Sequence, residues 1–174
     1  MHFNLRSLQS AHEHVERRYE PSMFPPEGEG FRVVSPVTLG FDIDKQKIGR
    51  YRLAGRVEGT LGLTCGRCLE PFTLPVDASF DLRYVPRTEN TGEGEREVEE
   101  DDLTTAFYSD EHIDLGHLIA EQFHLALPMK PLCSENCLGL CPQCGTNLNT
   151  GTCNCRQTWE DLRLAGLKEL KIKS

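Results

Sequence analysis

Polar and large apolar side chains alternate along three successive segments in the middle of the chain. In 37–44 and 50–64 the large apolar residues occupy odd positions, and in 72–84 the apolar residues occupy even positions. A period of two is typical of half-buried strands. Because each segment has one apolar and one polar face, the pattern predicts an antiparallel meander that is covered on one side.

Helical spacing appears on both sides of this meander. Residues 114–127 place apolar residues along one stripe behind Asp114, a residue suited to cap a helix N-terminus. Residues 158–170 form a second predicted helix, and residues 8–19 are compatible with a third. A short strand is predicted near 104–108. The expected fold class is α+β, an antiparallel β-sheet meander with two or three helices and zinc knuckles.

The zinc knuckles are predicted from the cysteine spacing. Eight cysteines fall in four close pairs: Cys65-x2-Cys68, Cys133-x3-Cys137, Cys141-x2-Cys144 and Cys153-x-Cys155. The N-terminus lacks the apolar stretch of a secretory signal, so a reducing, cytoplasmic location is expected. In that compartment paired cysteines serve as metal ligands or catalytic thiols more often than as disulfides. A structural zinc ion takes four thiolates, so eight predict two ions.

Two partitions of the eight thiols are open. One places Cys141, Cys144, Cys153 and Cys155 around one ion, and Cys65, Cys68, Cys133 and Cys137 around the other. The competing partition groups the thiols of 133–144 and leaves those of 65–68 with those of 153–155. Local spacing favours the first. A redox-active Cys-x-x-Cys is the alternative chemistry, but that motif belongs to a βαβ setting, whereas Cys65 and Cys68 lie between two predicted antiparallel strands.

Charge is distributed unevenly along the chain. The formal net charge is −8, and the aperiodic stretch 87–102 holds eight acidic residues against two arginines. This stretch predicts an acidic loop. Residues 45–67, by contrast, hold six basic residues against one acid. Local potential matters more for a partner than the overall sum, so net acidity does not exclude nucleic acid.

Four arginines in or beside this basic stretch are candidate RNA contacts. Three of them share one side of a predicted strand and the fourth lies in the turn between the first two cysteines: Arg50, Arg52, Arg56 and Arg67. Phosphates along RNA fit such a row. The alternative is structural, with the strand arginines paired to aspartates on neighbouring strands and Arg67 bonded to nearby carbonyls.

The chain shows no catalytic motif, and no apolar run approaches the length of a membrane span. It is therefore not expected to be an enzyme, and neither a membrane nor a small-molecule substrate is expected as a partner. Two sections are predicted. Residues 1–130 form the sheet domain with the acidic loop 87–102 and the helix 114–127, and residues 131–174 form a cysteine-rich zinc knuckle and a C-terminal helix, both packed on that same domain. The sequence gives no oligomeric state.

Three stretches resemble one known family. The run from Thr64 to Phe72, TCGRCLEPF, is similar to the Cys-x-Arg-Cys-Leu-x-Pro-Phe signature of the YceD family, the large ribosomal RNA subunit accumulation proteins of bacteria and plastids. Residues 114–128 are also similar to that family, and residues 133–148 resemble its longer, cysteine-rich forms.

This resemblance implies a non-enzymatic, zinc-stabilised factor that supports synthesis, processing or accumulation of large-subunit ribosomal RNA. The implied partner is a ribosomal RNA precursor or a large-subunit ribosomal protein. A different hypothesis is a protein–protein adaptor that uses the acidic loop to bind a basic partner.

Overall fold

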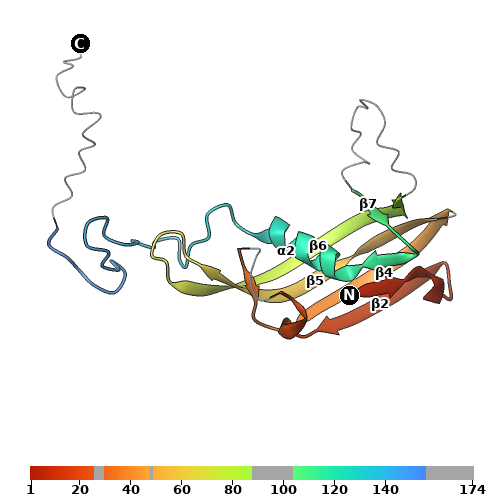
Figure 1. Cartoon of the computed structure of the whole chain (residues 1–174), viewed down its shortest axis with the longest axis horizontal. Helices are drawn as coiled ribbons and strands as arrows, with labels where there is room; N and C mark the ends of the chain where they lie inside the picture. Colours follow the sequence, from red (N-terminus) through yellow and green to blue (C-terminus); the bar gives the residue numbers. More distant parts are fainter. Residues whose placement is uncertain (26–29, 48, 88–103, 156–174) are drawn as a thin grey trace, which may run out of the picture.

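One curled β-sheet dominates the structure, a computed structural model that describes residues 1–25, 30–47, 49–87 and 104–155 (Figure 1). The strands run β2-β4-β5-β6-β7 across the sheet, β3 pairs with β5, and β1 and β8 form a separate pair. Strand bounds are β1 (His2–Asn4), β2 (His12–Tyr19), β3 (Arg32–Val33), β4 (Val37–Lys47), β5 (Arg50–Thr64), β6 (Pro71–Pro86), β7 (Thr105–Tyr108) and β8 (His112–Asp114). Within these described ranges the helical elements are α2 (Leu115–Ala126) and two single 3-10 turns, η1 (Leu5–Ser7) and η2 (Pro21–Met23).

The three alternating segments form the long central strands β4, β5 and β6, as predicted. Each pairs antiparallel with the next, and the β5–β6 register runs from Tyr51 opposite Tyr84 to Thr64 opposite Pro71. On β5 the large odd-numbered residues are buried and the arginines on even positions are exposed. Burial of one face therefore explains the period-two pattern.

The predicted number of helices is wrong, and the described part of the chain is mostly β-structure with α2 as its α-helix. The sequence of residues 8–19 is compatible with a helix, but residues 12–19 form β2, which pairs with β4 along its whole length. In β2 only Val15 is buried, so the segment carries almost no apolar periodicity of its own. Its strand conformation comes from the partner strand and from side-chain pairs such as His14 Nδ1 with Asp42, 2.8 Å apart. The helix predicted for 158–170 lies outside the described residues.

The meander prediction holds only for β4, β5 and β6. β7 adds to the free side of β6 in a parallel orientation, with Arg83 opposite Thr105. The chain between the end of β6 and the start of β7 contains the predicted acidic loop 87–102. Apart from Arg87, that loop lies outside the described residues.

The core lies between the curled sheet and α2, which runs along one face of it (Figure 1). Phe41 and Phe123, both fully buried, fill the space beside two glycines of β5. A Cβ on Gly55 would lie 2.5 Å from the Cβ of Phe41, and one on Gly59 would lie 3.1 Å from the ring of Phe123. Glycine at position 55 thus allows the backbone of β4 to lie close to β5, and glycine at position 59 allows the Phe123 ring to approach the strand.

Helix α2 begins where the sequence predicts. The Asp114 carboxylate accepts hydrogen bonds from the N–H groups of Gly116, at 2.9 Å, and His117, at 3.2 Å. The buried stripe contains Leu115, Leu118, Ile119, Gln122 and Phe123. Burial tends to raise the pKa of Asp114, but the hydrogen bonds from His117 and Gly116 hold it below its ordinary value. Within the described ranges, no helix combines the length and apolar character needed to cross a bilayer.

Replacing Asp114 with alanine is expected to lower the free energy of unfolding by about 1 kcal/mol, because α2 loses its N-cap acceptor. Asp114→Asn is the matched control, since it keeps an acceptor and removes the charge. The lowered pKa means that the ionised carboxylate stabilises the fold above the unfolded pKa of about 3.9 and loses that effect as pH falls through the folded value. Urea unfolding at neutral and acidic pH measures both effects. Equal stability of Asp114→Ala and the unmodified chain at neutral pH would contradict this assignment.

Candidate metal centres

The first cysteine tetrad joins the β5–β6 hairpin to the segment after α2. Cys65 and Cys68 lie in the turn between the two strands, and Cys133 and Cys137 come from the later segment. The Sγ atoms of Cys65 and Cys137 are 3.8 Å apart, those of Cys68 and Cys133 are 3.6 Å apart, and all four lie within 4.8 Å of one another.

These distances fit a metal better than they fit disulfides. A disulfide places its sulfur atoms about 2.05 Å apart. Four thiolates about 2.3 Å from a tetrahedral zinc ion lie about 3.8 Å from each other. The tetrad therefore has the donor set and the spacing of a structural zinc site. Cys65, Cys68 and Cys137 are buried and Cys133 is exposed.

Hydrogen bonds hold this tetrad in place from both segments. The Gly66 N–H donates to the Pro131 carbonyl at 2.8 Å, and the Leu140 N–H donates to the Arg67 carbonyl at 3.2 Å. The Arg67 N–H also lies 3.5 Å from Cys65 Sγ. Figure 1 shows the segment after α2 running to this end of the hairpin and continuing beyond it. The later segment is thus fixed to the end of the sheet.

The second tetrad is local in sequence and more exposed. Cys141, Cys144, Cys153 and Cys155 place their sulfur atoms within 4.8 Å of one another. Cys141 is buried, Cys144 is exposed, and the other two are half-buried. A tight turn at Gly145, with φ of +72°, lets its N–H donate to the Cys141 carbonyl at 2.9 Å. The thiols therefore group as in the first of the two partitions drawn from the spacing.

The pKa values of the thiols differ widely within each tetrad. A backbone hydrogen bond from Cys68 lowers the pKa of Cys65 to about 6, and the Thr146 hydroxyl lowers the pKa of Cys144 to about 6. The neighbouring Cys68 thiol raises the pKa of Cys133 to about 12. Cys144 likewise raises the pKa of Cys155 to about 12. One thiolate opposes ionisation of the next, and a bound dication removes that opposition.

Two of the strand arginines pair with aspartates on β6. Arg52 Nε donates to Asp81 Oδ1 at 2.8 Å, and Arg56 forms a two-point pair with Asp77. The arginine hydrogen bonds lower the pKa of both aspartates. Arg50 occupies the first position of β5. The structure thus realises the cross-strand alternative for Arg52 and Arg56.

Arg67 lies in the turn between Cys65 and Cys68 and is exposed. Its guanidinium donates to the Cys137 carbonyl at 2.9 Å, so it links the two halves of the first tetrad. Sequence reasoning missed a different link, from the loop of the second tetrad to the first: the Asn149 side-chain amide donates to Cys137 Sγ at 3.3 Å, and its oxygen accepts from the Leu138 N–H at 2.8 Å. The Asn147–Asn149 pair between cysteines is a signal for side chains that form turns.

The family model described as large ribosomal RNA subunit accumulation protein YceD matches residues 53–171. That range contains all eight cysteines. No solved structure matches the chain.

Among curated proteins, a large ribosomal RNA subunit accumulation protein YCED homolog 1, chloroplastic, from Zea mays is 30% identical over 160 residues, covering 79% of this chain and 53% of the maize protein. Uncharacterized proteins of Mycobacterium bovis and Mycobacterium tuberculosis are each 37% identical over 84 residues, covering 48% of this chain and 38% of theirs. The chain thus spans about half the length of the curated relatives it matches, or less.

Proposed function

The chain belongs to the YceD family, and on that premise we propose that it is a zinc-stabilised, non-enzymatic factor that supports the accumulation of large-subunit ribosomal RNA. The family match over residues 53–171 is the observation that carries this proposal. We propose that it acts in the cytoplasm, on a precursor of the large ribosomal RNA or on a large-subunit ribosomal protein. The maize relative, by contrast, is named as a chloroplastic protein.

Both cysteine tetrads are proposed to hold zinc. Four thiolates at tetrahedral spacing suit zinc or an iron–sulfur centre, and zinc is the metal expected at a structural site that has no redox function. Bound zinc would supply a fixed tetrahedral link between the β5–β6 turn and residues 133–137. The hydrogen bonds of Gly66 and Arg67 across the same junction support this role. The protein's contribution is a rigid end of the sheet.

RNA contact is proposed at this end of the molecule rather than along the arginine row. Arg52 and Arg56 are already paired with Asp81 and Asp77, which weakens their attraction for phosphate. Arg67 remains exposed in the knuckle turn, beside Leu69, whose side chain is 63% exposed. A turn that presents a cation and an apolar side chain fits both parts of a nucleotide. Arg50 stays a candidate from its sequence position alone.

Gradient sedimentation tests the proposed function. Tagged full chain in lysate is expected to migrate with large-subunit precursors at low salt and to leave them as salt rises, because counterion release drives phosphate contacts. An Arg52→Ala variant serves as the matched control and should migrate like the unmodified chain. Migration at the top of the gradient at both salt concentrations would contradict the proposal. It would then favour the adaptor hypothesis, and the acidic loop 87–102 would be deleted next.

A further inference from the structure

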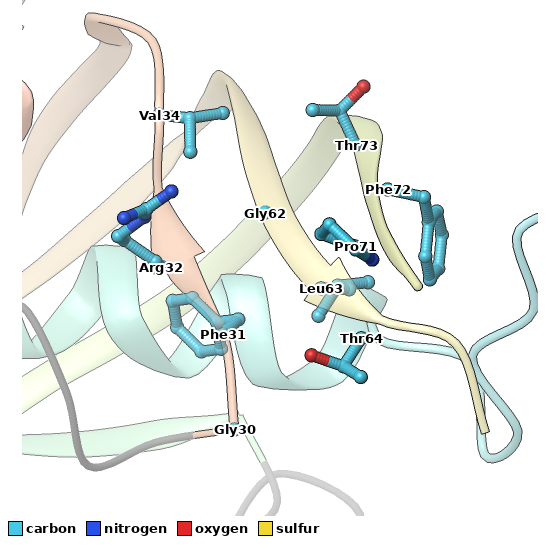
Figure 2. Close-up of a pocket in the computed structure, with 10 residues that line it drawn as sticks. All are labelled: Gly30, Phe31, Arg32, Val34, Gly62, Leu63, Thr64, Pro71, Phe72 and Thr73. Carbon is cyan, nitrogen blue, oxygen red and sulfur yellow. The ribbon is translucent and has the colours of Figure 1, made fainter. Parts of the chain in front are cut away.

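A hollow of about 470 Å³ lies on the polar side of the sheet, beside the β5–β6 turn that carries Cys65 and Cys68 (Figure 2). Three neighbouring strand segments line it. Six of its lining residues carry the argument: Arg32, Val34, Gly62, Thr64, Pro71 and Thr73. Thr64 directly precedes Cys65, and Pro71 opens the strand that follows the knuckle turn. The hollow is thus continuous along the chain with the first tetrad.

A missing side chain creates this hollow. Gly62 pairs with Arg32 of β3 on one side and with Thr73 of β6 on the other. A Cβ on Gly62 would lie 3.0 Å from a methyl carbon of Val34. β3 pairs with β5 over only two residues, Arg32 and Val33. Figure 2 shows Gly62 between the Arg32 strand and the Thr73 strand.

The chemistry of the lining is unusual for this sheet. The hollow contains one cation, Arg32, and no carboxylate. Arg32 is exposed and, among the residues that the structure describes, makes no ion pair, whereas Arg52 and Arg56 are both paired. Val34 and Pro71 add apolar surface and two threonines add hydroxyl groups, and the lining also includes Phe31, Leu63 and Phe72. Such a site offers a phosphate partner, an apolar wall and hydroxyls that can bond a base edge or a ribose.

We propose that this hollow binds one unstacked nucleotide of single-stranded RNA, with Arg32 at the phosphate and the apolar walls against the base. The inference rests on the proposed function, because it names the surface through which the chain would contact RNA. Sequence-specific RNA binding targets single-stranded segments whose bases are splayed out. The volume lies within the range of small-ligand sites, about 300–1,000 Å³. The exposed Arg67 and Leu69 of the knuckle lie next along the chain, where a neighbouring nucleotide would sit.

Two variants test this site in the zinc-loaded full chain. Arg32→Ala removes the cation from the surface, and Gly62→Val fills the hollow with a residue that favours strands. Arg52→Ala is the matched control, because it removes the same charge from the same sheet at a position already paired with Asp81. The probes are a fluorescein-labelled single-stranded oligouridylate and an RNA duplex of equal length, followed by fluorescence anisotropy.

Both site variants are expected to weaken binding of the single-stranded probe by about fivefold or more, the change that corresponds to one lost base or phosphate contact. Arg52→Ala and the duplex probe should show no such difference. Unchanged affinity in Arg32→Ala would overturn the assignment even if Gly62→Val failed to fold. An equal loss in Arg52→Ala would also overturn it, since nonspecific charge would then explain the binding.

The gradient experiment separates failure of this site from failure of the proposed function. If the unmodified chain migrates with large-subunit precursors and Arg32→Ala does so equally at every salt concentration, the hollow is not the RNA site and the function stands. If Gly62→Val instead loses a bound ribosomal protein while RNA affinity is unchanged, the hollow takes a polypeptide, and the nucleotide assignment is wrong.

Discussion

Replacing Cys65 with serine is expected to remove one of two zinc ions and to lower the free energy of unfolding by about 4 kcal/mol or more. Metal-binding free energy becomes folding free energy when the unfolded chain lacks the site, so loss of a metal belongs to the largest mutational effects. Cys65 is fully buried at the end of β5, and its tetrad fixes residues 131–140 to the sheet. Elemental analysis and guanidinium unfolding followed by circular dichroism measure the two effects.

Cys144→Ser is the matched control for this prediction. Cys144 is exposed, and its tetrad is closed within residues 141–155. Its loss should also remove one ion, but the transition of the sheet should shift little, because the second tetrad joins no strand. Equal destabilisation by the two variants would contradict the assignment of the first tetrad as the link to the sheet. A chain that holds iron, or no metal, would contradict the zinc assignment itself.

Replacing Gly55 with alanine is expected to lower the free energy of unfolding by about 3 kcal/mol, through overpacking against backbone atoms. The added Cβ would lie 2.5 Å from the Cβ of Phe41 and 2.6 Å from its Cα. Since Phe41 is fully buried and β4 is paired on both sides, neither strand can move away alone. Urea unfolding followed by far-ultraviolet circular dichroism gives the stability difference.

Gly40→Ala is the control on the paired strand. A Cβ on Gly40 meets no atom within 4 Å among the described residues, because this position faces the polar side of the sheet. Its stability should equal that of the unmodified chain or exceed it by about 0.5 kcal/mol, since alanine restricts the unfolded chain more than glycine. If Gly55→Ala were as well tolerated as Gly40→Ala, the result would contradict the close approach of β4 to β5 at Gly55.

The central sheet was predictable because burial is one-sided. On β5, buried Tyr51 and buried Val57 each lie between two exposed residues, and that alternation needs no knowledge of partners. β2 was not predicted as a strand, because a single buried residue, Val15, produces no alternation of apolar and polar positions. Its conformation depends on pairing with β4. The short strand predicted near 104–108 is confirmed as β7, but its parallel pairing with β6 depends on a partner and was not predicted. Sequence patterns thus identified strands with their own amphipathic signal and missed β2, whose conformation long-range pairing imposes.

The metal ligands and the basic surface differ in the same way. Close pairs such as Cys141 and Cys144 are visible in the sequence, and locality favoured the grouping that the structure adopts. The arginine row was correctly placed on an exposed face, but its diagonal partners Asp77 and Asp81 depend on strand register. The hollow at Gly62 could not be predicted from the sequence, because a glycine within a strand does not indicate which residues surround it.

Crosslinking in living cells tests the central claim most directly. The tagged full chain is irradiated with ultraviolet light, purified under denaturing conditions, and the attached RNA is sequenced. Enrichment of large-subunit ribosomal RNA and its precursors, reduced in the Arg32→Ala variant and retained in Arg52→Ala, is the predicted result. Recovery of no ribosomal RNA above a mock purification from untagged cells, while large-subunit RNA accumulation depends on the chain, would contradict direct docking on RNA.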